Sequence, residues 1–192
     1  MTTVVIALVT VGTLLQDANP TQVQQYPVEL PSPKLIKQVR PDYPEKAARA
    51  GFGGPVILQA QVDAQGRVVD ARVLHGIPLL NEPALAAVKR WTYEPFLLNG
   101  NPTPFTLTVT VTFSPGSLFR GFDAGVLAGL LKGDDAETSR YAAEFVGNRA
   151  HQFRSEDRKK LNEALNIVLS RDPPQAVKDA ATRALEQLSK RK

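Results

Sequence analysis

Apolar and polar residues alternate most cleanly in residues 105–113, where threonines separate the apolar side chains. A period of two is typical of a β-strand with one buried face. We therefore predict a strand whose apolar residues face a core and whose threonines face away from it. The apolar residues are Phe105, Leu107, Val109, Val111 and Phe113; the threonines are Thr106, Thr108, Thr110 and Thr112.

A second alternating segment runs from Val56 to Val62 and ends in a turn signal, Asp63-Ala64-Gln65-Gly66. The pattern predicts a strand followed by a bulged hairpin, in which Gly66 supplies the positive φ angle that closes the turn. The return strand is expected to place Val69, Ala71 and Val73 on one face.

Two short helices are predicted around this hairpin. The first begins at Tyr43-Pro44 and ends at Gly51, because proline is tolerated in a first turn and glycine is common at a helix end. The second begins with Asn81 as its N-cap and Pro83 in its first turn. Its buried side is expected to carry Ala84, Val88 and Trp91, with Trp91 as a core anchor and not a ligand contact.

The order helix, strand, strand, helix, strand predicts an α+β domain over residues 34–114. Two helices on one face of a small antiparallel three-stranded sheet is the natural packing for this order.

Beyond a joint at residues 115–120 the apolar period becomes 3.6, and an all-α region is predicted over residues 121–192. Ser155 and Asp172 are the expected caps of its last two helices. A weak repeat, in which Asp134 and Ala142 recur as Asp172 and Ala180, is typical of HEAT-like helical repeats. We expect this region to fold as a separate unit with a modest interface to the first domain. The predicted helices cover residues 122–132, 135–147, 156–170 and 174–190.

The N-terminal residues 1–18 contain an apolar stretch at 4–15, which is shorter than the roughly 20 residues that span a bilayer. Its length suits a signal-peptide core, although no Lys or Arg precedes Lys34. We interpret it as an export signal or the remnant of an anchor; a frayed terminus or a start codon placed too late is the alternative. Residues 19–33 are rich in proline and are predicted to be an extended linker.

Charge and composition argue against several function classes. The net charge of +4 is spread over the chain, which disfavours nucleic-acid binding, and the absence of cysteine excludes disulfides and thiolate metal sites. His75 and His151 stand apart without a carboxylate cluster, and the serines near residue 115 have no histidine motif beside them. We therefore expect no metal site, no cofactor and no catalytic residue.

The spaced set Tyr43-Pro44, Asp63-x-x-Gly66, Trp91-x-Tyr93-x-Pro95 and Asn99-Gly100 resembles the C-terminal domain of TonB-family proteins. The resemblance covers about residues 34–114. It implies a non-enzymatic module that binds a protein partner in the periplasm, with attachment to the inner membrane through the N-terminal segment if that segment is not cleaved. An outer-membrane TonB-dependent receptor is one candidate partner.

The resemblance also implies where a partner peptide adds as a strand: the stretch around the Tyr-Pro pair and the last strand. An edge strand with free N–H and C=O groups is suited to this mode. The alternative interpretation of the threonines is a simple solvated sheet face. The implied partner-binding residues are Val39, Arg40, Pro41, Asp42, Tyr43, Thr106, Thr108, Thr110 and Thr112.

The chain departs from energy-transducing members of this family, which carry a transmembrane helix with a histidine and a long Pro-rich span with Lys and Glu runs. Three hypotheses therefore stay open. The first is a periplasmic adaptor. The second is an energy transducer that couples the inner-membrane proton-motive force to outer-membrane receptor transport, with a missing or atypical N-terminal anchor. The third is an accessory or regulatory domain of a larger envelope sensor.

Overall fold

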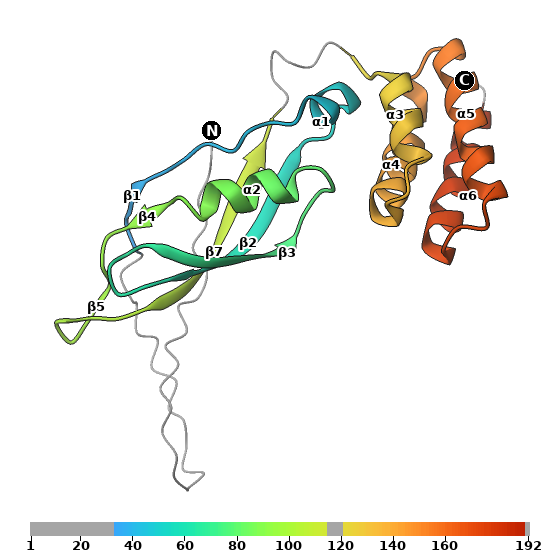
Figure 1. The fold of residues 1–192 in the computed structure, drawn as a ribbon. Helices are drawn as coiled ribbons and strands as arrows, with labels where there is room; N and C mark the ends of the chain where they lie inside the picture. The colour runs from blue at the N-terminus through green and yellow to red at the C-terminus, as the bar shows by residue number, and fades with distance from the viewer. Residues whose placement is uncertain (1–32, 115–120, 191–192) are drawn as a thin grey trace, which may run out of the picture. The chain divides into compact units, whose positions relative to one another are not determined.

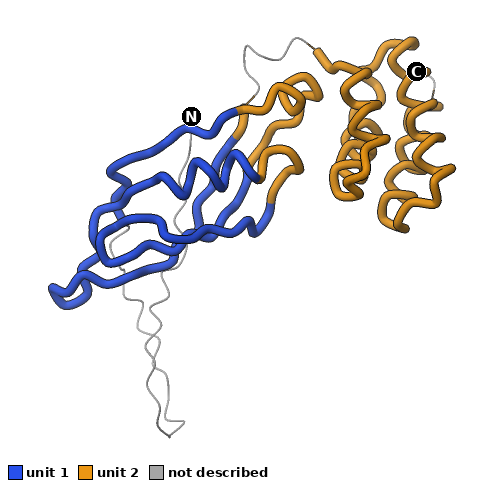
Figure 2. The backbone as a smooth tube through the Cα atoms, viewed as in Figure 1, with its two compact units in different colours: residues 1–42, 56–75, 82–112 blue, residues 43–55, 76–81, 113–192 orange. Residues whose placement is uncertain are grey.

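The computed structural model describes residues 33–114 and 121–190. The predictions for residues 1–18, most of the linker and the joint at 115–120 lie outside this part of the chain. The described residues divide into two compact units (Figure 2). Residues 33–42, 56–75 and 82–112 form the first, and residues 43–55, 76–81, 113–114 and 121–190 form the second. The second unit thus contains segments of the predicted α+β domain as well as the helical region, and the predicted domain boundaries stay a prediction.

A three-stranded sheet forms the centre of the first unit. It consists of β2 (Gly54–Val62), β3 (Val68–His75) and β7 (Phe105–Phe113) in the order β3-β2-β7. β2 and β3 pair antiparallel through the hairpin, and β7 runs opposite to β2 (Figure 1). The predicted α+β class with a small antiparallel sheet is confirmed.

The predicted alternation holds along β7 and β2. All five apolar residues of β7 are buried, as are Val56, Leu58, Ala60 and Val62 on β2. On β3 the prediction for Val69 is wrong, because its side chain is 61% exposed and the buried position is Val68. The cause is a register shift between Gln61 and Val62 of β2, which inserts an extra residue into β3 and moves the neighbouring side chains to the other face.

The turn between β2 and β3 has the predicted chemistry. Gly66 has φ +83°, and the Asp63 carboxylate accepts the backbone N–H groups of Gln65 and Arg67 at 3.0 and 2.9 Å. These hydrogen bonds, led by that from Arg67, hold the pKa of Asp63 below its ordinary value. A Cβ atom at Gly66 would lie 1.9 Å from the carbonyl oxygen of Tyr93. Glycine is therefore required both for its positive φ angle and because a side chain has no room there.

Helix α2 (Asn81–Val88) lies across the strands (Figure 1) and leads to the buried Trp91. Trp91 is 1% exposed, and its indole N–H donates to the carbonyl oxygen of Val39 at 2.8 Å, which confirms it as a core anchor. The predicted N-cap role of Asn81 is wrong: Asn81 is the first helical residue, and its Oδ1 has no hydrogen-bond partner among the described residues.

Four short strands complete the first unit. β1 (Leu35–Lys37) pairs antiparallel with β4 (Thr92–Tyr93), and β5 (Leu97–Leu98) pairs with β6 (Asn101–Pro102). The turn of the second pair is Asn99-Gly100, with φ +52° and +81°. Two successive positive φ angles are what an Asn-Gly hairpin turn requires.

Helix α1 (Glu45–Ala50) belongs to the second unit. It begins after Pro44 and ends at Gly51, whose φ of +76° places it in the left-handed region, as predicted. Its buried face is made of alanines, namely Ala47, Ala48 and Ala50.

The helical region consists of α3 (Ala124–Leu131), α4 (Ala136–Asn148), a 3₁₀ turn at Ala150–Gln152, α5 (Ser155–Ser170) and α6 (Gln175–Ser189). Each helix agrees with its predicted range to within two residues, while the HEAT-like repeat stays a prediction. α4 packs most extensively on α6, where Gly147 allows close approach: a Cβ there would lie 3.2 Å from the Cα of Ala184.

The predicted caps of the last two helices are wrong. Neither Ser155 nor Asp172 makes a capping hydrogen bond; Ser155 is the first residue of α5, and α6 begins after Pro174. The capping side chains are Asp123 before α3 and Asp135 before α4. Hydrogen bonds from Thr138 lower the pKa of Asp135.

None of the helices within residues 33–114 and 121–190 has both the length and the apolar character needed to cross a membrane.

Candidate partner-binding edge

β7 is the terminal strand on one side of the sheet, and no strand of the described residues pairs with its outer edge. It is nine residues long and contains neither a charged residue nor a proline. Its alternating buried side chains fix which face points inward, so a chain added at this edge meets a strand of defined register. These are the properties that strand addition requires.

The opposite edge, β3, is less suited to strand addition. Its register against β2 shifts twice, between Ile57 and Leu58 and between Gln61 and Val62. It also carries the charged residues Asp70 and Arg72. Bulges and charged side chains are the usual means by which edge strands avoid pairing with other chains. The two edges of one sheet therefore differ, and β7 is the edge better suited to strand addition.

The predicted threonines lie on the face of β7 opposite to the core. Thr106, Thr108 and Thr110 are half-buried and Thr112 is exposed. No side-chain hydrogen bond engages any of the four within the described residues. Their hydroxyl groups are consequently available to water or to a partner.

The predicted binding residues before α1 have different structural roles. Tyr43 packs on Phe113 at the end of β7, with 5.7 Å between ring centroids, and its hydroxyl donates to the carbonyl oxygen of Phe52. Burial raises the pKa of Tyr43. Val39 is half-buried, and its carbonyl oxygen is occupied by Trp91. These two residues are therefore packed parts of the fold.

Arg40 and Asp42 are exposed, and Pro41 between them is half-buried. Among the described residues, no ion pair or hydrogen bond joins the side chain of Arg40 or Asp42 to β7 or to any other element. The structure thus connects the segment to β7 through Tyr43 and Phe113.

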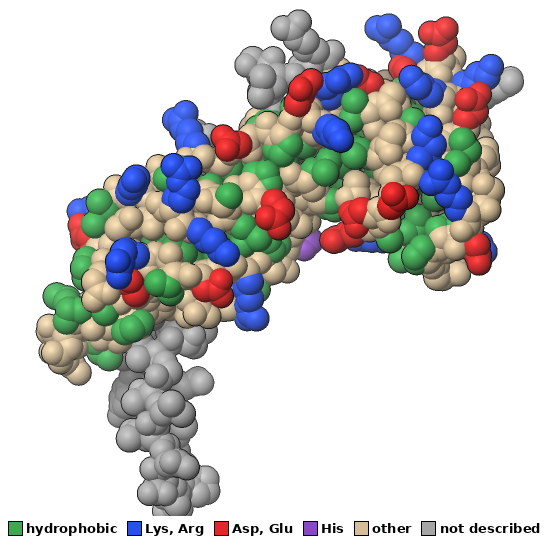
Figure 3. Space-filling view, viewed as in Figure 1, with side chains coloured by type: hydrophobic (Ala, Val, Ile, Leu, Met, Phe, Trp, Pro, Cys, Tyr) green, Lys and Arg blue, Asp and Glu red, His purple; other side chains and the backbone are tan. Residues whose placement is uncertain are grey.

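The described residues hold no group of three or more His, Asp or Glu side chains placed to bind a metal ion. Charged side chains of both signs are scattered over the face in Figure 3, without a large patch of one sign. The feature that stands out is the sheet edge and not a polar pocket.

Comparison with known proteins bears on this edge directly. Residues 39–115 match the family model described as the Gram-negative bacterial TonB protein C-terminal. Residues 39–115 are thus similar to the C-terminal domain of TonB proteins. The match includes both predicted binding segments, Val39 to Tyr43 and β7.

Two relatives extend the comparison. The chain is 31% identical over 105 residues to "Protein TonB" of Vibrio cholerae, covering 51% of this chain and 43% of that protein. It is 30% identical over 64 residues to "Protein TonB" of Yersinia enterocolitica, covering 32% of this chain and 25% of that protein. The chain thus spans less than half the length of either relative. The solution NMR structure of the Pseudomonas aeruginosa TonB CTD is 24% identical, with a TM-score of 0.37, over 45% of this chain and 90% of that one.

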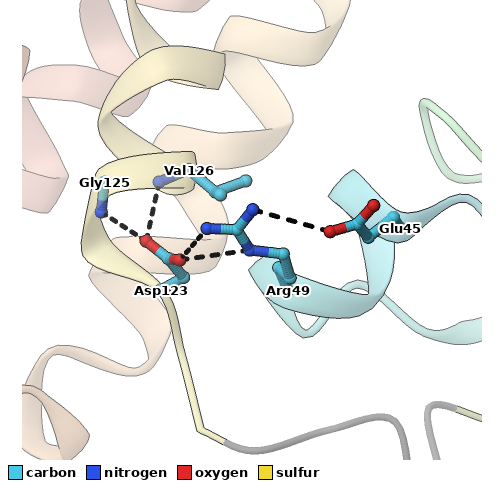
Figure 4. Close-up of polar contacts among 5 residues, drawn as sticks. All are labelled: Glu45, Arg49, Asp123, Gly125 and Val126. Carbon is cyan, nitrogen blue, oxygen red and sulfur yellow. Dashed lines mark hydrogen bonds and ion pairs between the residues drawn. The ribbon is translucent and has the colours of Figure 1, made fainter.

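An ion pair between α1 and α3, both in the second unit, is not predicted by the sequence patterns. Arg49 of α1 donates to Oδ2 of Asp123 from Nη2 at 2.6 Å and from Nε at 3.2 Å (Figure 4). Asp123 Oδ1 accepts the N–H groups of Gly125 and Val126, which caps α3. The signal that could have revealed the cap is an aspartate directly before an apolar run.

This network also sets the titration of its members. The hydrogen bond from Arg49 is the largest cause that lowers the pKa of Asp123, followed by that from the Val126 N–H. The same pairing raises the pKa of Arg49. Asp123 thus carries a negative charge at the N-terminus of α3, where the helix dipole favours it.

Proposed function

We propose that the TonB C-terminal domain of this chain binds a segment of a partner protein as an added strand along the outer edge of β7. The domain acts in the periplasm as a non-enzymatic interaction module. The observation that carries the proposal is the difference between the two edges of the sheet, one bulged and charged, the other uncharged and unpaired among the described residues. An outer-membrane TonB-dependent receptor is the partner class that fits.

The energetics favour such binding without demanding much of the partner's sequence. Each main-chain hydrogen bond formed at β7 contributes about 1 kcal/mol net. Side chains of the added strand alternate in direction, so only every second one meets the threonine face. Arg40 and Asp42, which are exposed and form no ion pair within the described residues, are positioned in sequence to contact charges of the partner.

The absence of cysteine from the chain allows a direct test by disulfide trapping. Thr108→Cys and Thr110→Cys place a thiol on β7, and Leu74→Cys, at a position 50% exposed, is the matched control on β3. The probes are extended peptides taken from receptor segments, each with one terminal cysteine. We expect trapping at the β7 positions and not at Leu74→Cys.

Amide exchange provides the second readout. With a trapped or saturating peptide, alternate amides of residues 105–113 should become protected. Protection confined to the helices after residue 121, with none on β7, would show that the partner binds elsewhere.

A second candidate function is energy transduction, supported by the similarity to proteins named TonB. In that case the chain couples an inner-membrane proton-motive force to transport through the receptor. The two candidates are separated by an uptake assay in cells, with and without a protonophore. Uptake that depends on both the chain and the proton-motive force supports transduction; partner binding without such uptake supports an adaptor.

A further inference from the structure

A groove of about 460 Å³ lies between α1, the segment 76–81 and α3, all within the second unit. Its apolar lining comes from Leu79, Val126, Gly129 and Leu130, and its charged lining includes Lys46 and Asp134. The volume falls in the range of about 300–1,000 Å³ that is typical of ligand-binding clefts in proteins. The groove is distinct from the edge of β7.

Helix α3 carries apolar residues on its buried side and also on the side that lines the groove. Ala124, Leu127, Ala128 and Leu131 are buried, as expected for the inner face of a helix. Val126 and Leu130 are only half-buried, and they line the groove. A surface helix normally turns polar residues outward, so apolar residues here leave a face that the described residues do not cover.

Leu79, on the opposite wall, has an unusual backbone. Its φ of +70° lies in the left-handed region, which is strained for a non-glycine residue. The adjacent Leu80 is fully buried, which holds the segment in place while Leu79 lines the groove. Strain of this kind is commonly found where a residue contributes to a binding site.

Some charged side chains around the groove already form ion pairs or capping hydrogen bonds, and others do not. Arg49 is paired with Asp123, and Asp135 caps α4. Lys46 and Asp134 are exposed and form no ion pair among the described residues. These two opposite charges, which come from different elements, therefore stand beside an apolar floor and are open to a ligand.

We propose that this groove binds an amphipathic helical segment of a partner protein, whose apolar residues lie between an acidic and a basic residue. The acidic residue pairs with Lys46 and the basic residue with Asp134. A helix fits better than a strand, because the walls are helices and a loop and offer no open strand edge among the described residues.

Gly129 provides a sharp probe of the groove. A Cβ at this position meets no atom within 4 Å, so Gly129→Ala is accommodated and serves as the matched control. Gly129→Trp places a large ring at the groove that Gly129 lines. For the charge, Lys46→Glu is compared with Lys89→Glu, an exposed lysine of the first unit. None of these variants alters β7, so the outcome is independent of the proposed function.

The experiment is selection of a random peptide library, of about twelve residues each, on the full chain. We expect enriched peptides with two or three apolar residues at helical spacing between an acidic and a basic residue. Measured by fluorescence anisotropy, their affinity should fall at least about tenfold for Gly129→Trp and for Lys46→Glu. It should be unchanged for Gly129→Ala and Lys89→Glu.

Three results would overturn the proposal. The first is that no peptide is enriched, and the second is that the enriched peptides bind wild type and Gly129→Trp equally. The third is a dimer of the full chain, detected by sedimentation, that Gly129→Trp abolishes; it would assign the groove to a second copy of this chain.

Discussion

Two tyrosine hydroxyls are placed in contrasting surroundings. Tyr93 is fully buried, and its hydroxyl has no hydrogen-bond partner among the described residues. Burial accordingly raises the pKa of Tyr93 well above its ordinary value. The Tyr43 hydroxyl, in contrast, donates to the Phe52 carbonyl oxygen.

We therefore expect Tyr93→Phe and Tyr43→Phe to change the free energy of unfolding by amounts that differ in sign or in size. Tyr93→Phe removes a buried polar atom that the described residues leave unpaired, so it should leave the free energy of unfolding unchanged or raise it by up to about 1 kcal/mol. Tyr43→Phe should lower it by about 0.5–1.5 kcal/mol, because a hydrogen bond is lost. Urea unfolding at pH 7 measures both; a larger loss for Tyr93→Phe would mean that its hydroxyl is bonded.

Trp91 combines packing with a hydrogen bond to Val39. Trp91→Ala should lower the free energy of unfolding by about 3–5 kcal/mol, a large share of the stability of a small domain. Trp91→Phe retains most of the packing and is the control for the lost indole N–H. If Trp91→Ala left the melting temperature unchanged but removed partner binding, the assignment to the core would fail.

At the scale of elements, comparing alanine substitutions at the two hairpin glycines distinguishes backbone strain from steric clash. Gly66 and Gly100 have nearly the same φ, +83° and +81°, but only Gly66 is crowded by Tyr93. Gly100→Ala should cost roughly 1–2 kcal/mol for the left-handed conformation alone. Gly66→Ala should cost clearly more, because the new Cβ also meets a backbone oxygen. Equal losses in urea unfolding would show that the turn relaxes around the clash.

The cap of α3 predicts a pH effect of defined sign. The pKa of Asp123 is lower in the folded chain than its ordinary value near 4, so its stabilisation is present above that pH and is lost as the pH falls below it. Asp123→Asn keeps a capping side chain but cannot ionise. We expect it to be less stable than wild type at pH 7 by up to about 1 kcal/mol, since Arg49 is half exposed.

Urea unfolding at pH 7 and near pH 3 measures this effect. The difference between wild type and Asp123→Asn should shrink at the lower pH, because the unfolded carboxylate, with its ordinary pKa, binds a proton before the folded one does. Arg49→Ala should show the same trend. Lys89→Ala should not, because it alters an exposed lysine that forms no ion pair within residues 33–114 and 121–190. A difference that is the same at both pH values would remove the ion pair as its cause.

Sequence patterns predicted the elements better than the details that join them. The alternation of β7 and the turn at Gly66 are local, and both were found as expected. Alternation alone places Val69 on the wrong face, because a bulge depends on the pairing of two strands and leaves no mark in the pattern of one. Asp172 resembled a cap by position, yet the chain there turns with φ +50° and α6 begins later. That β7 lies at an edge of the sheet follows from the strand order, which the pattern of a single strand does not encode.

At the scale of the whole molecule, Phe52 joins the matched segment to the helices that follow it. Phe52 lies within the matched domain and is fully buried. Its ring lies 4.9 Å from that of Tyr141 and 4.9 Å from that of Phe145, both on α4. Edge-to-face and tilted aromatic contacts of this kind stabilise beyond the area that they bury. The packing of Phe52 on α4 depends on tertiary contacts, which the periodicity of neither segment encodes.

This packing leads to a test with two substitutions and a truncation. A chain that ends at Ser114 should keep its β signature but melt at a lower temperature, because Phe52 loses Tyr141 and Phe145. In the full chain, Phe52→Ala should lower the free energy of unfolding by about 3–5 kcal/mol. In the truncated chain the same substitution should cost much less, because the ring is already exposed to water. Val56→Ala, at a fully buried position of β2 in the first unit, is the control and should cost a similar amount in both chains. If Phe52→Ala cost the same in the two chains, the helices would not be what buries Phe52.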